Sequence, residues 1–299
     1  MLILLSLLLY LIGSGLASMV TDYALQMLII QLSIVAPSAV WVILCAKGKL
    51  PKRTVSETLG IHPIRPVICL EIALLMLFAA PVLTFVNVVS QMISSQAAGV
   101  EIVTSIIDYP YIVSVLIIGI LPAICEEFVY RGMLFTGLKK LSLPAAAVVS
   151  GLIFGLMHLN LNQFCYAFLM GAVFCLTDET VGSTLAGAIM HCLVNTTSVT
   201  IAYAVKWIGK TELLNTTVNT RNSFLVAYYL IPACIGAVMS VYMLKLMASQ
   251  TGREEHMKKE LNRKGFWQAL RKMLTPALVF AGIILTVLMV VTELELGTN

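Results

Sequence analysis

The chain has 299 residues, of which 59% are hydrophobic and only 11% are charged, and its mean hydropathy is +0.95. Soluble domains carry about a quarter charged residues, so this composition excludes a water-soluble globular protein. The net charge of +4 does not indicate nucleic-acid binding, because the positions of the basic residues follow a membrane pattern described below. We expect no nucleic-acid partner.

Apolar stretches long enough to cross a hydrocarbon core, which takes about 20 helical residues, follow one another along the chain. The alternation of a β-barrel is absent, so the fold class is all-α, a polytopic transmembrane helix bundle forming a single membrane domain over residues 1–299. The fifth and sixth stretches are short, so we predict eight to nine spans in the multi-pass protein of a cell membrane. They are residues 1–20, 24–46, 67–90, 111–138, 144–160, 163–177, 182–205, 223–247 and 274–292.

Lys and Arg residues concentrate on one side of the predicted bundle. Fifteen of the 19 lie in segments 46–65, 139–140 and 245–272, whereas the opposite side has three. By the positive-inside rule the crowded side is cytoplasmic. Segment 91–110 contains no Lys or Arg, and we predict that it faces outward.

The polar segment 249–273 is the most charged part of the chain. Its charges, together with Phe266, Trp267 and Leu270, suit a short helix on the inner leaflet. A solvated basic loop explains the same residues.

The fourth predicted span contains two adjacent glutamates and an arginine. Arg131 follows Glu127 by four residues, so the two share a helix face and form an ion pair. Glu126 points about 100° away and remains available for other work. Pro122 removes a helical hydrogen bond four residues before Glu126, which predicts a kink. A buried structural ion pair beside a protonated Glu126 explains the same segment without a catalytic role.

Two later spans contribute histidines. Phe154 and His158 are four residues apart, and so are His191 and Asn195, so each pair shares a helix face. A lone membrane histidine is more often a hydrogen-bonded packing residue, and an asparagine in hydrocarbon often bridges two helices. Each pair alone therefore leaves its role open.

The depths of these residues favour one shared site within the predicted core helices 111–205. Counted from the cytoplasmic ends, Glu126, His158, His191 and Asn195 lie about 20, 21, 17 and 22 Å deep at 1.5 Å per residue. Ionisable groups at mid-membrane are costly, and unrelated structural residues have no reason to reach one level. We therefore expect their side chains to meet.

Such a site suits peptide hydrolysis without a covalent intermediate. A carboxylate beside a neutral imidazole polarises water, and a second histidine with an asparagine donates hydrogen bonds to an oxyanion. No GxSxG or HExxH motif is present. A zinc ion held by Glu126, His158 and His191 is compatible with the same side chains, and sequence spacing does not exclude it.

The three motifs together resemble the CAAX protease and bacteriocin-processing (CPBP, or Abi) family of intramembrane endopeptidases. That family has the motifs EExxxR, FxxxH and HxxxN on successive helices, and here they occupy residues 126–131, 154–158 and 191–195. The resemblance covers about a quarter of the chain, roughly residues 120–197. Each motif alone is a weak signal, so the resemblance rests on the order of the three motifs and on the separations between them.

The resemblance implies roles for six residues. Glu126 and His158 activate water, His191 and Asn195 form the oxyanion site, and Glu127 with Arg131 orients the others. Members are often labelled metalloproteases, whereas the CAAX-processing branch points to a metal-free glutamate mechanism. We favour the metal-free form with no cofactor, because Glu126 suffices as a base. The implied partners are membrane lipids and a substrate, which is a peptide or a prenylated, lipid-proximal protein.

Two functions from other classes use the same residues. A proton-coupled transporter uses a Glu/His relay, but such proteins commonly have two related halves, and no internal duplication is evident. A catalytically idle immunity protein keeps the fold without the chemistry. The filled motif positions argue against it.

Overall fold

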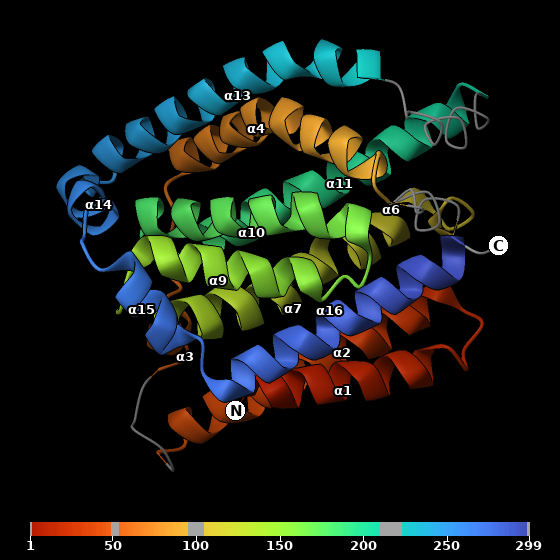
Figure 1. Ribbon diagram of the computed structural model, residues 1–299, viewed down its shortest axis with the longest axis horizontal. Helices are drawn as coiled ribbons and strands as arrows, with labels where there is room; N and C mark the ends of the chain where they lie inside the picture. The colour runs from red at the N-terminus through yellow and green to blue at the C-terminus, as the bar shows by residue number, and fades with distance from the viewer. Residues whose placement is uncertain (1, 49–53, 95–104, 210–222, 298–299) are drawn as a thin grey trace.

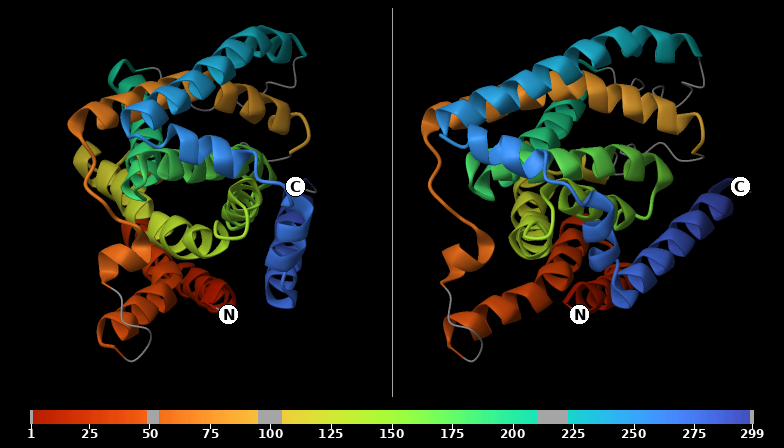
Figure 2. Two further views of the ribbon diagram at one scale, coloured as in Figure 1. Left: turned by 90° about the vertical axis from the view of Figure 1, so that its left-hand side faces the viewer. Right: turned by 60° about the vertical axis from the view of Figure 1, so that its left-hand side comes forward.

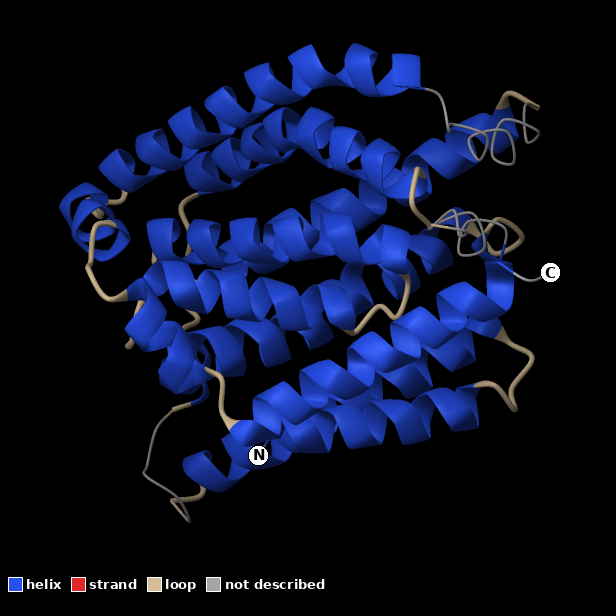
Figure 3. Ribbon diagram, viewed as in Figure 1, coloured by secondary structure: helices blue, strands red, loops and turns tan. Residues whose placement is uncertain are grey.

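The computed structural model describes residues 2–48, 54–94, 105–209 and 223–297. Every regular element in this part of the chain is a helix (Figure 3). A helix satisfies its own backbone hydrogen bonds, as hydrocarbon requires. The prediction of an all-α membrane bundle is confirmed. Parts of the loops that the sequence places on the two sides, residues 49–53 and 95–104, lie outside the described residues.

Seven helices in the described residues are long and apolar enough to cross a membrane, fewer than the eight to nine predicted. The two remaining apolar helices, α1 (Leu2–Ala17) and α9 (Leu143–Leu156), have 16 and 14 residues. A helix of 14 residues is only about 21 Å long, and most of α9 is buried inside the bundle. The long helices are α2 (Tyr23–Ala46), α4 (Pro66–Gln91), the composite helix Tyr111–Leu138, α10 (Leu161–Val181), α11 (Leu185–Trp207), α13 (Ser223–Gln250) and α16 (Pro276–Gly297).

The helices form tiers around α9 and α10 (Figure 1). Helices α4 and α13 pack along one edge, and α1, α2 and α16 lie at the opposite edge. The end-on views in Figure 2 place α9 and α10 between these two groups. Helix α9, which carries Phe154 of the FxxxH motif, therefore lies in the inner part of the bundle.

The helix from residue 111 to residue 138 changes its winding four times. It runs as α6 (Tyr111–Ser114), the π-helix η1 (Val115–Ile120), α7 (Leu121–Glu127), the π-helix η2 (Phe128–Phe135) and α8 (Thr136–Leu138). The sequence predicted a kink at Pro122, and the structure has a π-helical turn directly before it. Short π segments of this kind are frequent at functional sites.

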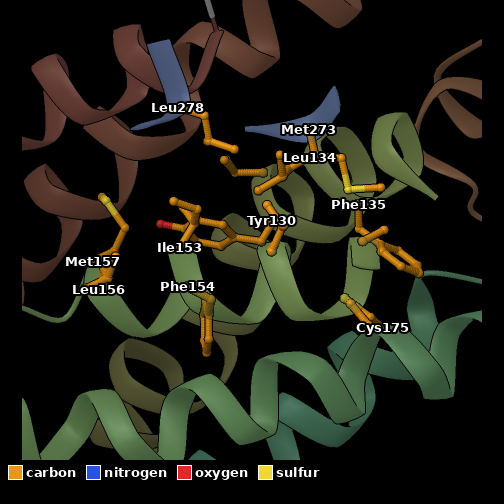
Figure 4. Close-up of a cluster of buried hydrophobic side chains, with 14 of the residues drawn as sticks. Tyr130, Leu134, Phe135, Ile153, Phe154, Leu156, Met157, Cys175, Met273 and Leu278 are labelled. Carbon is orange, nitrogen blue, oxygen red and sulfur yellow. The ribbon is translucent and has the colours of Figure 1, made fainter. Parts of the chain in front are cut away.

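Glycines bring α9 and α10 into close contact. A Cβ atom added to Gly171 would lie 2.8 Å from the Cα of Gly151, so only glycine fits at this crossing. Away from α10, buried apolar side chains of α9 and η2 pack in one cluster with side chains from residues 273–289. Figure 4 shows Tyr130 and Ile153 facing Met273 and Leu278 in this cluster. These contacts fix α9 between α10 and η2.

Three short elements gather at one end of the bundle: α3 (Val55–Leu59), α14 (Glu254–Leu261) and α15 (Phe266–Met273) (Figure 1). The Arg263 Nη1 donates to the Lys140 carbonyl at 3.4 Å, and the Arg65 guanidinium donates to the Gln250 carbonyl. The three basic segments therefore share one end, as the positive-inside argument requires. Segment 249–273 contains two helices instead of the single one predicted.

Candidate active site

Both motif glutamates lie at the end of α7, and the predicted ion pair is present. The Glu127 Oε1 lies 2.8 Å from Nη1 of Arg131. The two side chains are 3% and 0% exposed, so neither charge reaches water. A buried pair of this kind is stable only while both partners remain.

Aromatic rings and a backbone carbonyl hold the Arg131 guanidinium in place. Its central carbon lies 4.4 Å from the ring centroid of Phe154 and 5.0 Å from that of Phe174. Its Nη2 donates to the Gly171 carbonyl at 3.2 Å. The phenylalanine of the FxxxH motif therefore covers the arginine of the EExxxR motif.

His191 lies between the two glutamates. Its Nδ1 is 2.9 Å from Glu127 Oε1, and its Nε2 is 3.9 Å from Glu126 Oε2. The ring stacks on Phe174 at 5.2 Å between centroids, which fixes its plane. The structure thus brings His191 and both glutamates together, as the common depth predicted. It also makes Glu127 the hydrogen-bond partner of two motif residues, His191 and Arg131.

Glu126 has a partner that sequence reasoning missed. The buried Gln31 on α2 donates from Nε2 to Glu126 Oε1 at 2.7 Å. The side-chain amide oxygen of Gln31, Oε1, is buried and has no hydrogen-bond partner among the described residues. The sequence contained one signal for this contact. Gln31 is an amide residue in an apolar span, and amide side chains in membrane helices hydrogen-bond to other helices. The contact leaves Oε2 of Glu126 facing His191.

His158 lies in a turn and not within a helix, which corrects the predicted span 144–160. Helix α9 ends at Leu156, and Asn160 caps the start of α10. Leu159 has a φ of +52°, an unusual conformation for leucine, and this reverses the chain directly after the histidine. The Nδ1 of His158 is 2.8 Å from the Phe154 carbonyl, so the predicted four-residue relation between them is kept.

The His158 ring also packs against Phe154, with centroids 5.0 Å apart, and Phe154 in turn packs against His191 at 5.7 Å. A carbonyl oxygen only accepts hydrogen bonds, so Nδ1 of His158 carries the proton and Nε2 is left as an acceptor.

Asn195 binds a carbonyl that proline leaves free. Pro122 has no N–H to offer the Ile118 carbonyl four residues earlier. The Nδ2 of Asn195 donates to that carbonyl at 3.0 Å. This bond ties α11 to η1 and uses one of the two amide hydrogens. The other is available to a ligand.

Asp178 is a second residue that sequence reasoning missed, and its carboxyl group approaches the same glycine as that of Glu127. Its Oδ1 accepts from the Gly187 N–H at 2.6 Å. A Cβ atom at Gly187 would lie 3.2 Å from both Asp178 Oδ2 and Glu127 Oε2, so the two carboxyl groups converge on this glycine. Both of these oxygens are buried and without a hydrogen-bond partner in the described part of the chain. The predicted span 163–177 stops one residue short of Asp178, whereas α10 continues to Val181.

The zinc set considered from the sequence does not form a preassembled ligand group. Within the described residues, no three His, Cys, Asp or Glu side chains are arranged to hold a metal ion. One nitrogen of His191 already contacts Glu127, and one nitrogen of His158 contacts a carbonyl. Each imidazole still has its Nε2 available and Glu126 has its Oε2, so these side chains also suit acid–base chemistry on water.

A family model matches the part of the chain that contains the site. Residues 108–197 match the family model described as Type II CAAX prenyl endopeptidase Rce1-like, and this segment contains all seven motif residues. The match covers less than a third of the chain. No curated protein and no solved structure gives a significant match. Residues 108–197 are therefore similar to Rce1-like type II CAAX prenyl endopeptidases, which confirms the resemblance of the three motifs and supports an intramembrane protease.

Proposed function

We propose that this chain is an intramembrane endopeptidase that hydrolyses a peptide bond with a water molecule activated by Glu126 and His158. The observation that carries the proposal is the separation of 3.9 Å between Glu126 Oε2 and His191 Nε2 in the interior of the bundle. One water oxygen about 2.8 Å from each of two polar atoms at this separation can hydrogen-bond to both. A water molecule held in this way donates to Glu126 Oε2.

The base side of the reaction is prepared by two hydrogen bonds. Gln31 occupies Oε1 of Glu126 and thereby turns Oε2 toward the site. The Phe154 carbonyl fixes the His158 ring so that its Nε2 accepts a proton or a hydrogen bond. Glu126 then takes the proton of the attacking water, and His158 orients that water.

The oxyanion side depends on His191 and Asn195. An ionised Glu127 only accepts, so Nδ1 of His191 carries a proton, and Nε2 donates when the ring holds both protons. In this doubly protonated form, the positive charges of His191 and Arg131 offset the negative charges of Glu126 and Glu127, and unbalanced charge is costly in an apolar interior. The free amide hydrogen of Asn195 supplies the second donor to the tetrahedral intermediate.

The substrate we propose is a peptide or a prenylated protein whose cleavage site lies close to the lipid. The matched family is named for prenyl endopeptidases, and the buried position of the site suits a substrate that enters from the bilayer of a cell membrane. Membrane lipids are the other expected partners, and the mechanism requires no cofactor.

The decisive variant is Glu126→Gln, which keeps the size of the side chain but removes the base. Purified protein is assayed on a prenylated CAAX peptide and on a hydrophobic leader peptide. We expect hydrolysis to fall by about 10²–10⁴-fold, since general-base catalysis supplies gains of this order, with the melting temperature nearly unchanged. The matched control is Glu71→Gln, which alters a buried glutamate bound to Gln250 on the α4–α13 side and should retain activity.

Equal hydrolysis by the wild type and Glu126→Gln would refute the assigned role. Absence of hydrolysis in the wild type on both substrates would favour the idle immunity protein or the transporter.

Metal removal separates the two catalytic mechanisms. In the metal-free mechanism a chelator leaves the activity of pure protein within about twofold, because Glu126 supplies the base. In the zinc mechanism the protein contains stoichiometric zinc, a chelator abolishes hydrolysis and added zinc restores it. His191→Ala tests the same point, and joint loss of bound zinc and activity in this variant would overturn the metal-free proposal.

A further inference from the structure

A cavity of about 200 Å³ opens at the basic end of the bundle, outside the site described above. It lies where the α8–α9 turn and the end of α10 meet α14. Its charged and titratable lining residues are Lys139, Lys140, Glu179, His256, Glu260 and Arg263. No part of the proposed hydrolysis uses them.

One carboxylate in this cavity already has several basic partners. The Glu179 Oε2 lies 2.7 Å from the Lys139 ammonium, and its Oε1 lies 2.6 Å from both Arg253 Nη2 and His256 Nε2. The Arg253 Nε also donates to the Glu179 backbone carbonyl at 2.6 Å. Three basic side chains thus already share the negative charge of Glu179.

Two basic groups of the cavity are weakly paired or unpaired. Arg263 lies 3.5 Å from Glu260, and no acidic group in the described part of the chain pairs with the Lys140 ammonium. The lining thus contains three cations, Lys139, Lys140 and Arg263, and two carboxylates, a surplus of one positive charge before His256 is counted. A surplus of this kind in a cavity attracts an anion, and Lys and Arg together suit phosphate oxygens.

The neighbouring helix places the cavity at the level of the lipid headgroups. Helix α15 buries Ala269 and Met273 against the bundle, while Trp267 is 72% exposed and Arg271 and Lys272 follow in its last turn. A short helix with an exposed tryptophan and basic residues is typical of the membrane–water interface. Basic pockets between helix ends at this level bind anionic headgroups.

We propose that this cavity binds a phosphate group, supplied by the headgroup of an anionic phospholipid. Lys140 and Arg263 make the main contacts, and Lys139 uses the ammonium hydrogens that Glu179 leaves free. The proposal is independent of catalysis, because none of these residues belongs to the candidate active site.

The test measures the melting temperature of the purified full chain in phosphatidylcholine micelles with and without phosphatidylglycerol. Ligand binding to the folded state alone raises the melting temperature, and we expect a rise of about 5 °C at saturating phosphatidylglycerol. The double variant Lys140→Gln/Arg263→Gln should lose most of this rise. Lys140→Gln alone should lose part of it, and this residue has no side-chain contact whose loss would unfold the protein.

The matched control is Lys264→Gln/Lys272→Gln, which removes two positive charges from the same end but outside the cavity and should keep the rise. An equal rise in the wild type and the cavity variant, or an equal loss in the control, would overturn the proposal. A further arm replaces the lipid by inorganic phosphate at about 10 mM. A cavity-dependent rise with inorganic phosphate and none with phosphatidylglycerol would assign the cavity to free phosphate and refute the lipid.

Discussion

Two glutamates of this chain each hold an arginine and a histidine, but in different surroundings. Glu127 binds Arg131 at 2.8 Å and His191 at 2.9 Å in the middle of the bundle. All three side chains are at most 5% exposed. Bulk solvent does not reach these side chains, so each charge depends on the others.

Glu179 forms the corresponding cluster at the basic end. Its contacts to Arg253 and His256 are both 2.6 Å, and Lys139 is a third partner at 2.7 Å. Glu179 is itself buried, but its three partners are 31–42% exposed. Water therefore reaches these cations when the carboxylate is removed.

The comparison teaches that short distances alone do not rank ion pairs. The contacts of Glu179 are as short as those of Glu127, yet solvent screens its partners and leaves the partners of Glu127 unscreened. Glu179 also has more partners than Glu127, although we expect its cluster to contribute less to the free energy of unfolding. Substitutions at the two glutamates should therefore differ in size and in salt dependence.

The largest effect is expected for Glu127→Gln. Removing one partner of a buried pair leaves Arg131 as an uncompensated charge, which costs roughly 3–5 kcal/mol of unfolding free energy. Denaturant unfolding of the purified protein in detergent measures this, and hydrolysis should be lost together with stability because His191 also loses its partner. Glu71→Gln serves as the control in a buried position without an ion pair. A loss below about 1 kcal/mol would contradict the uncompensated-charge argument.

An intermediate effect is expected at Asp178. Asp178→Ala removes the acceptor of the buried Gly187 N–H and opens space beside Glu127, which should cost about 1–3 kcal/mol. Asp178→Asn keeps an acceptor for Gly187 and adds an N–H toward Glu127 Oε2, which lacks a partner in the described residues. We expect the asparagine variant to retain most of the stability and of the kcat. Equal losses in both variants would show that Asp178 does not act through hydrogen bonds.

The smallest effect is expected for Glu179→Gln. Its cations remain hydrated, so we expect a loss of about 1 kcal/mol, and less at 1 M salt because exposed pairs are screened. The same salt series applied to Glu127→Gln should leave its larger loss nearly unchanged. A loss at Glu179 that matches the loss at Glu127 would remove the distinction between the two clusters.

The sequence predicted the relations that follow from helix geometry, which are spacing along one helix and depth along neighbouring helices. The spacing of four residues placed Glu127 beside Arg131, and the structure contains that pair. The common depth placed His191 near the glutamates, and both contacts are present. Local periodicity and the rise per residue fix such relations.

Other contacts between distant segments were not predictable from the sequence. Gln31 reaches Glu126 from a helix almost 100 residues away, and periodicity does not reveal such a partner. Asp178 was not recognised because an acidic residue at the end of an apolar stretch suggests a helix terminus in water, whereas α10 carries it into the interior. The turn at His158 depends on the positive φ of Leu159, which leucine seldom adopts.

The π-helical turns on both sides of α7 have a consequence for how this chain tolerates changes in length. A π turn contains one residue more than the α turn that it replaces, so η1 behaves like a single-residue insertion in an otherwise regular helix. Deleting one residue there would restore α-helical winding and rotate the preceding segment by about 100° relative to Glu126. The Ile118 carbonyl would turn away from Asn195. Homologous chains that keep this bond should therefore align without a gap across residues 115–126.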